Sequence, residues 1–239
     1  MDLPLYLLAI LAMIFSIWAQ FKVKSTFNKF SRVHTGNGRT AAQVADMILK
    51  NAGINNVRIE RVRGSLTDHF DPRTNTLRLS DAVYDSTSAA AVGVAAHEAG
   101  HAVQHAVGYT PIKIRASLVP AASFASRFTW ILIMLGALMM GLTTGATGVA
   151  GGDLGYTIML VGVALFSVVT LFELVTLPCE FNASRRAMEA LEGCGWYRDD
   201  ELRASRKVLT AAALTYVANL AVSLIQLLRL ISRLNNRRR

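Results

Sequence analysis

The sequence predicts a mainly helical α+β protein that is embedded in a membrane and carries one small β-sheet. Hydrophobic residues make up 52% of the chain and charged residues only 17%, against about 25% charged in an average soluble domain. Long apolar runs without a charged residue include Leu3–Phe21, Phe128–Gly152 and Leu154–Phe172. Each has close to, or more than, the roughly 20 helical residues that cross a bilayer core. We therefore expect about three transmembrane helices plus a hydrophobic C-terminal helix.

The first apolar run also has the length of a secretory signal peptide. It lacks the basic segment that opens such a signal, and no small-residue cleavage site occurs before Lys22. We therefore expect residues 1–21 to form a retained transmembrane anchor. The rest of the chain then divides into three parts. Residues 22–115 carry a histidine-rich helix, residues 116–177 form a transmembrane hairpin, and residues 178–239 form a C-terminal helical part with a basic tail.

The distribution of cations predicts the orientation. Lys and Arg gather in residues 22–39 and 185–207, whereas the connection after the second run has neither. The positive-inside rule then places the N-terminus and that connection outside, and residues 22–115 and 178–207 in the cytoplasm. Topology and anionic lipid explain the net charge of +9. No basic face interleaved with aromatic residues indicates nucleic acid as a partner.

A fourth apolar run, Val208–Leu228, departs from this pattern because it contains Thr215, Asn219, Ser223 and Gln226. It can span the membrane, lie in the interface or join the folded core. If it spanned, the arginines that follow it would lie outside, against the positive-inside rule. We favour a partly buried helix whose basic tail touches the cytoplasmic leaflet.

Two elements are expected early in the cytoplasmic part. Residues 40–53 have the pattern of a short amphipathic helix, with Thr40 as its cap and Gly53 as its end. Residues 57–62 alternate apolar with charged side chains, which is the period of a half-buried strand.

A strand and a long helix follow. A turn at Asp71–Arg73 leads into a second alternating segment, Thr76–Ser80. The alanine-rich segment after it predicts a helix that Ser86 or Thr87 caps and Gly108 ends.

That helix carries three histidines at a spacing of four, in the segment AAHEAGHAVQH. His97 and His101 lie one turn apart on one face, so their imidazoles can converge on one metal ion. Glu98 lies about 100° around the helix, beside the metal, which is the place for a general base acting on water. Two neutral imidazoles in this arrangement favour zinc. A structural pair of histidines is the alternative.

His105 does not fit the same ion. No glycine bends the chain between His101 and His105, and roughly 12 Å of helical rise separate His105 from His97. We expect His105 to form a hydrogen bond at the helix end. Cys179 and Cys194 do not make a disulfide framework and are expected to be packing residues.

A catalytic zinc needs a third protein ligand and an open fourth position. The acidic residues after the helix are Asp153, which is expected outside, Glu173 within the third run, and Glu180, Glu189 and Glu192 in the cytoplasm. Glu180 stands where the third run ends. Pro178 is suited to open a new helix there, with Ala183 and Ala187 at a close-packed seam.

The segment Glu180-x-x-Ala-Ser-x-x-Ala resembles the third-ligand helix of gluzincins, as in the membrane proteases HtpX and the CAAX prenyl protease. Ser184 stands where those proteins have Asp. Together with DHFDPRTNTLRLS and HEAGHAVQH, the segment LPCEFNASRRA resembles the bacterial neutral zinc metallopeptidases called YugP-like, over nearly the full chain. The resemblance implies a gluzincin-like membrane metallopeptidase in the bacterial cytoplasmic membrane, with one Zn²⁺ held by His97, His101 and Glu180.

The function expected is hydrolysis of peptide bonds in a protein or peptide substrate, with Glu98 as the general base. A second group that stabilises the oxyanion is usual, and the candidates are His69, Arg186 and Tyr216. The strand Thr76, Leu77, Arg78, Leu79, Ser80 is expected either to pair with an extended substrate as a sheet edge or to lie inside the sheet. His69 and Asp71 can also serve only to organise the turn.

The alternative function is a metal-binding but inactive membrane adaptor. An intact Glu98 argues against it, because a scaffold has no need of a base beside the metal. A channel or transporter would need more spans and an intramembrane charge pair. A membrane partner protein and the oligomeric state stay open.

Overall fold

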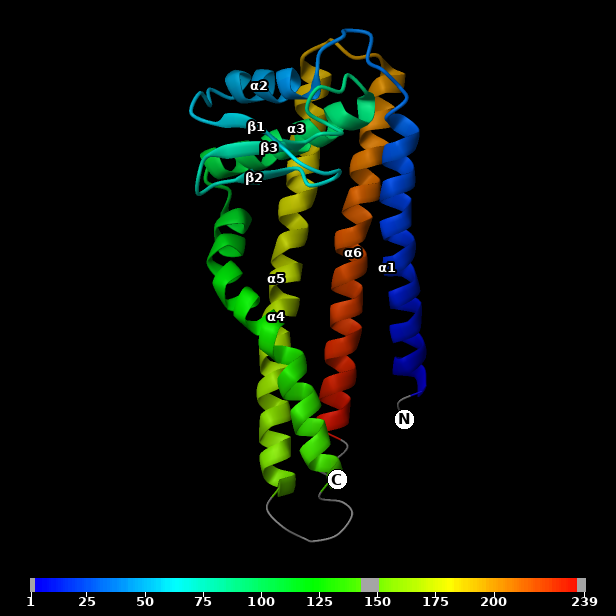
Figure 1. Cartoon of the computed structure of the whole chain (residues 1–239), viewed down its shortest axis with the longest axis vertical. Helices are drawn as coiled ribbons and strands as arrows, with labels where there is room; N and C mark the ends of the chain where they lie inside the picture. The colour runs from blue at the N-terminus through cyan, green and yellow to red at the C-terminus, as the bar shows by residue number, and fades with distance from the viewer. Residues whose placement is uncertain (1–2, 143–150, 236–239) are drawn as a thin grey trace. The chain divides into compact units, whose positions relative to one another are not determined.

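The structure is a computed structural model that describes residues 3–142 and 151–235 (Figure 1). Of the connection expected outside the membrane, residues 143–155, the first eight lie beyond the described residues and the rest belong to the first turns of α5. The elements in chain order are α1 (Leu3–Phe30), α2 (Ala41–Asn51), β1 (Arg58–Val62), β2 (His69–Asp71), β3 (Thr76–Ser80), α3 (Ala89–Ala106), α4 (Thr110–Leu142), α5 (Gly151–Gly193) and α6 (Asp199–Asn235).

The chain folds into two compact units. The bundle unit comprises residues 1–16, 114–175 and 217–239, and the sheet unit comprises residues 17–113 and 176–216. Among the described residues, four helices are long and apolar enough to cross a membrane: Leu3–Phe30, Thr110–Gly141, Asp153–Gly193 and Asp199–Asn235. The mainly helical composition and the single small sheet agree with the sequence-based expectation, and α6 joins the three predicted spans as a candidate.

The sheet of the sheet unit has the strand order β1-β3-β2, with β1 parallel and β2 antiparallel to β3. The expectation that Thr76–Ser80 forms a free edge is therefore wrong, because β3 is hydrogen-bonded on both sides. Its central place follows from its side chains. Leu77 and Leu79 are fully buried in the hydrophobic core, and Ser80 on the opposite side is buried against Asp68, which accepts hydrogen bonds from its backbone N–H and its hydroxyl.

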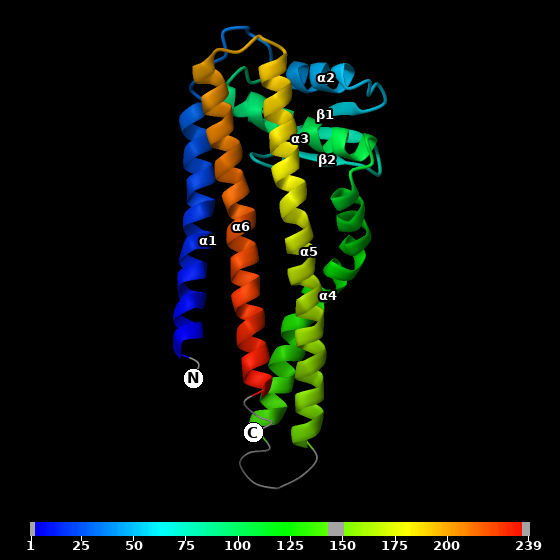
Figure 2. The ribbon, with the colours of Figure 1, turned by 180° about the vertical axis from the view of Figure 1, so that it is seen from behind.

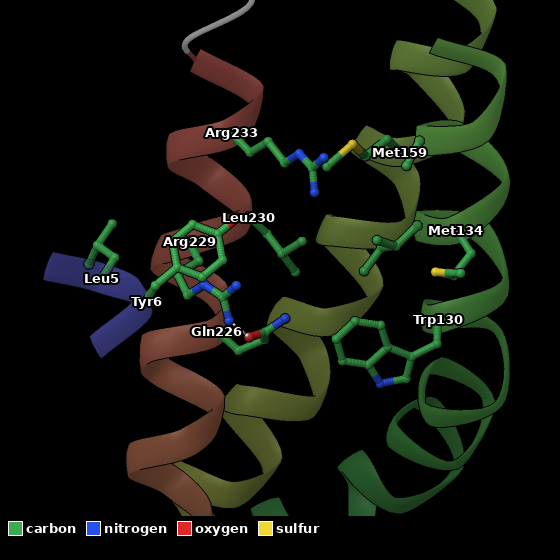
Figure 3. Close-up of a pocket in the computed structure, with 11 residues that line it drawn as sticks. Leu5, Tyr6, Trp130, Met134, Met159, Gln226, Arg229, Leu230 and Arg233 are labelled. Carbon is green, nitrogen blue, oxygen red and sulfur yellow. Dashed lines mark hydrogen bonds between the residues drawn. The ribbon is translucent and has the colours of Figure 1, made fainter. Parts of the chain in front are cut away.

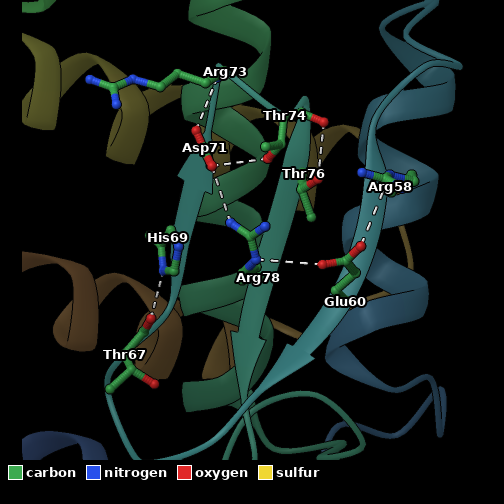
Figure 4. Close-up of polar contacts among 9 residues, drawn as sticks. All are labelled: Arg58, Glu60, Thr67, His69, Asp71, Arg73, Thr74, Thr76 and Arg78. Atoms are coloured by element: carbon green, nitrogen blue, oxygen red, sulfur yellow. Dashed lines mark hydrogen bonds and ion pairs between the residues drawn. The ribbon is translucent and has the colours of Figure 1, made fainter.

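The outer face of the sheet is held by charges centred on Arg78 (Figure 4). Its guanidinium forms ion pairs with Glu60 of β1 at 3.5 Å and with Asp71 of β2 at 3.2 Å. Asp71 also accepts hydrogen bonds from the Arg73 backbone N–H and the Thr74 hydroxyl, which fixes the turn before β3. The turn predicted at these residues is confirmed.

The helices of the sheet unit begin and end largely where the sequence indicates. Thr40 caps α2 in a capping box, and Gly53 follows the helix with φ of 72°. The cap of α3 is Ser88, whose hydroxyl accepts from the Ala91 backbone N–H. Ser86 and Thr87 were the wrong candidates, because the Ser86 hydroxyl bonds to Ser88 and the Thr87 hydroxyl to His34.

Pro178 does not open a new helix, because α5 runs unbroken from Gly151 to Gly193. A proline inside a helix removes one backbone hydrogen bond and crowds the preceding turn. Pro178 lies on the exposed side of the helix, whereas Cys179 and Glu180 are buried. The packed face of α5 therefore continues past the proline into the segment that carries Glu180.

In the bundle unit, the last turns of α6 lie beside the first turn of α1. The Arg229 guanidinium lies 4.2 Å from the centre of the Tyr6 ring. The expectations that the N-terminus lies outside and that Arg229 touches the cytoplasmic leaflet therefore cannot both hold, and residues 236–239 of the basic tail lie outside the described part of the chain. The apolar residues of α6 continue its helix up to these arginines, so the polar side chains within the run did not keep it from packing with the other apolar helices.

Candidate metal centre

The two histidines of the HExxH segment present their rings from one face of α3. The ring centres of His97 and His101 are 4.7 Å apart and the ring planes are nearly perpendicular, at 86°. Alanine and glycine fill the buried positions around them, including Ala95, Ala96 and Ala99, which are fully buried. These small side chains let α3 lie in the core of the sheet unit without pushing its neighbours away.

Glu180 reaches the histidines because α5 passes very close to α3, a crossing that Figures 1 and 2 show. A Cβ added at Gly100 would lie 2.7 Å from the backbone oxygen of Ala183. Only glycine allows the two backbones this approach. Ala183 and Ala187 are both fully buried, as the predicted close-packed seam requires.

Three ligand atoms converge at this crossing. Glu180 Oε2 lies 3.2 Å from His97 Nε2 and 3.5 Å from His101 Nε2. The ligand atoms of the three residues all lie within 4.8 Å of one another. Two imidazole nitrogens and one carboxylate oxygen are a donor set that zinc accepts, and the set leaves a fourth position open. The residues therefore fit a zinc ion.

Each histidine is oriented by a hydrogen bond at its other ring nitrogen. His97 Nδ1 lies 3.1 Å from the Ser184 hydroxyl, and His101 Nδ1 lies 3.0 Å from Gln104 Oε1. An amide oxygen can only accept, so the proton of neutral His101 is on Nδ1 and Nε2 keeps its lone pair. Ser184, which stands where the resembled gluzincins have Asp, thus contacts His97.

The support around Gln104 extends across both helices. Its side-chain nitrogen donates to the Cys179 backbone oxygen at 2.7 Å and to Asn182 Oδ1 at 3.0 Å. Asn182 Oδ1 also accepts from Arg186 Nε at 2.9 Å. Gln104 is fully buried, and its two polar side-chain atoms make three hydrogen bonds. This chain fixes the side chain that orients His101.

The charges of the two glutamates act on His101. Burial by itself would lower the pKa of this imidazole, but the hydrogen bond with Glu180 and the negative charges of Glu98 and Glu180 raise it above its usual value. Glu98 is half-buried on α3, next to the ligand set and not part of it. Its carboxylate therefore lies close enough to raise the pKa of His101 without being one of the three candidate ligands.

The other predicted site residues lie around this centre or apart from it. His105 is exposed and its ring lies edge-on to Phe70, with ring centres 6.0 Å apart. His69 is exposed on β2 with Nδ1 at 2.9 Å from the Thr67 backbone oxygen, and Tyr216 is half-buried on α6. Hydrogen bonds connect Arg186 to His101 through Asn182 and Gln104. An oxyanion role for His69, Arg186 or Tyr216 stays a prediction.

Sequence reasoning missed Gln104 and Asn182. Gln104 was visible as a polar side chain three residues after His101 in a helix otherwise made of small residues. Residues three apart on a helix are neighbours, so this spacing was a usable signal. Asn182 gave none, because its role depends on the crossing of α3 and α5. Cys179 is fully buried, and both cysteines are free thiols, in agreement with packing roles.

Comparisons with known proteins found a matching family and a relative of this chain. The model of a family described as "Putative neutral zinc metallopeptidase" matches residues 5–235. The chain is also 44% identical over 224 residues to a Bacillus subtilis (strain 168) protein named "Putative membrane protease YugP", a match that covers 94% of this chain and 93% of the relative. No solved structure matches.

Proposed function

The chain belongs to the neutral zinc metallopeptidase family just described, and from that premise we propose that it is a membrane-embedded, zinc-dependent endopeptidase. The observation that carries the proposal is the convergence of His97, His101 and Glu180 beside a carboxylate, Glu98, that is not among the ligands. A metal site that served only structure would be closed by a fourth protein ligand.

One Zn²⁺ is proposed to bind His97 Nε2, His101 Nε2 and a Glu180 carboxylate oxygen. When bound, zinc supplies Lewis acidity, which acidifies a water molecule and polarises the carbonyl of a peptide bond. Ser184 and Gln104 hold the imidazoles with their Nε2 atoms toward Glu180. These hydrogen bonds hold the two histidines in one orientation, which reduces the cost of ordering the site.

Glu98 is proposed to move the proton. As the general base, its carboxylate takes a proton from the attacking water, and it then delivers that proton to the nitrogen of the leaving amine. Its position one residue after His97 places it beside the ligand set on the helix, and its charge acts on His101. Arg186, His69 and Tyr216 remain candidates for stabilising the oxyanion.

The substrate is proposed to be a protein or peptide in an extended conformation. Such a segment can add to an open sheet edge through backbone hydrogen bonds. Because β3 is central, the sheet offers only the outer edges of β1 and β2. The shorter strand β2 is the better candidate, because Phe70 on this strand contacts the ring of His105 on the helix that carries the histidines.

The site is proposed to face the cytoplasm from the bacterial cytoplasmic membrane. Cysteine labelling in intact cells tests this orientation. A cysteine replacing Gly148, which lies outside the described residues, should react with an impermeant reagent, and a cysteine replacing Arg63 should be protected. The opposite pattern would place the site outside the cell.

The function itself is tested with purified full-length protein in detergent or lipid. We expect about one zinc per chain and cleavage of casein, which a chelator abolishes and added zinc restores. Bound zinc without cleavage of any protein substrate would favour the adaptor alternative. Cleavage that persists after complete removal of metal would refute the proposed chemistry.

A further inference from the structure

The bundle unit contains a cavity of about 330 Å³ that the metal site does not use (Figure 3). All four apolar helices contribute to its walls, with Tyr6 from α1, Trp130 from α4, Met159 from α5, and Arg229 and Arg233 from α6. The cavity therefore combines an apolar lining with two guanidinium groups.

Within the part of the chain that the structure describes, no carboxylate balances the positive charge in this cavity. None of the described lining residues is acidic. Arg229 donates from Nη1 to Gln226 Oε1 at 2.9 Å and lies over the ring of Tyr6, so both of its close contacts are neutral. Across residues 3–142 and 151–235, the ion pairs of the protein include neither Arg229 nor Arg233.

The surroundings make this imbalance costly. The cavity lies among helices whose outer surfaces are apolar: Leu135 and Leu138 of α4 are 43% and 60% exposed. A cation held among membrane helices is expensive unless it is paired. Tyrosine and tryptophan at the cavity are the residues that gather at headgroup level in membrane proteins. Arg229 is half-buried and Arg233 exposed, so a molecule that lies at this level of the bilayer can supply a counter-charge to both.

We propose that the cavity binds the phosphate headgroup of an anionic phospholipid, with part of an acyl chain along its apolar wall. Arginine pairs with phosphate through two parallel N–H bonds, which suits two guanidinium groups that share one cavity. Met159 and Trp130 present the apolar surface that an acyl chain would cover. A free phosphate ion would satisfy the arginines and leave this wall uncovered, so the lipid is the better fit.

The test measures which lipids stay with the full-length protein. Wild-type protein is reconstituted with a mixture of phosphatidylglycerol and phosphatidylcholine and extracted in mild detergent, and the retained lipids are quantified by mass spectrometry. We expect enrichment of phosphatidylglycerol in the wild type. Each basic residue near a membrane surface strengthens binding of anionic lipid about fivefold, so Arg229→Gln with Arg233→Gln should reduce the enrichment roughly 25-fold.

Two controls separate the alternatives. Arg127→Gln removes an exposed cation of the same unit that does not line the cavity, and it should leave the enrichment unchanged. Added inorganic phosphate should not displace the lipid. Equal retention of both lipids by the wild type, an equal loss in Arg127→Gln, or displacement by phosphate would each overturn the proposal. The wild-type measurement decides the matter even if the double variant fails to fold.

Discussion

Both units bring two helices into contact at a glycine, but the two contacts serve different ends. In the sheet unit, a Cβ at Gly100 would lie 2.7 Å from the Ala183 oxygen. In the bundle unit, a Cβ at Gly136 would lie 2.6 Å from the Met159 nitrogen. The first crossing is surrounded by paired polar side chains, whereas the second is surrounded by apolar ones such as Ile133 and Val163.

The difference teaches what each contact has to position. Dispersion and small residues are sufficient to pack apolar helices in a membrane. A metal site also requires that each ligand be held in one orientation, because misoriented ligands lose affinity. At the first crossing, Gln104 fixes the orientation of His101, and its hydrogen bonds tie α3 to α5. The close approach of the helices brings the ligands together, and the hydrogen bonds orient them.

The largest expected effect is loss of the metal when a ligand is removed. His97→Ala, His101→Ala and Glu180→Ala should each lose zinc and cleavage, by more than the roughly 10- to 100-fold cost of losing an outer hydrogen-bond partner. Metal content after dialysis, measured by mass spectrometry, checks this.

Glu189→Ala and Glu192→Ala are the matched controls on the same helix. Both carboxylates lie on the exposed side, paired with Arg185 and Arg206, so zinc content should stay nearly unchanged. If Glu189→Ala emptied the site and Glu180→Ala did not, the third ligand would have been assigned to the wrong glutamate.

The next prediction compares zinc affinity after the same substitution at each of the two helix crossings. Gly100→Ala and Gly136→Ala each force a methyl group against a backbone, and overpacking of this kind costs about 1–3 kcal/mol of stability. Zinc affinity should fall in Gly100→Ala, because the crossing that unites the ligands must widen, and should hold in Gly136→Ala. Calorimetric titration of zinc with thermal unfolding as the companion measurement separates the two. Equal zinc affinity in both variants would contradict the role assigned to the Gly100 approach.

A smaller effect is expected at the orienting side chains. Gln104→Ala and Ser184→Ala remove the partners of His101 Nδ1 and His97 Nδ1, and each should weaken zinc binding roughly 10- to 100-fold. Gln104→Ala should be the more severe, because it also removes the hydrogen bonds to the Cys179 oxygen and to Asn182 Oδ1 that tie α3 to α5. Competition with a zinc-chelating dye checks the order. Tight binding in both variants would show that the crossing alone aims the ligands.

The sequence predicted the local parts of this account better than the parts that depend on packing. The HExxH spacing and the alternation of Thr76–Ser80 repeat at the period of a helix and a strand, so each is visible within a few residues. The continuation of α5 through Pro178 depends on which side of the helix is packed, and local preference alone favoured a helix start there.

The site shows the same division. His97, His101 and Glu98 are contiguous in the chain, and their arrangement follows from helix geometry. Glu180 came from a resemblance to known families, since the residues alone left several carboxylates open. The hydrogen bonds of Gln104 to the Cys179 oxygen and to Asn182 join distant segments. No local pattern encodes that contact, so the structure was needed to find it.

The central claim is that Glu98 moves the proton while the other three residues hold the metal. Glu98→Gln keeps the size of the side chain and removes its basicity, so paired measurements of zinc content and casein cleavage on this variant test the claim most directly. We predict about one zinc per chain, as in the wild type, with cleavage reduced by at least the roughly 10²–10⁴-fold that a general base contributes. Near-normal cleavage by Glu98→Gln would contradict the account, and so would loss of its zinc.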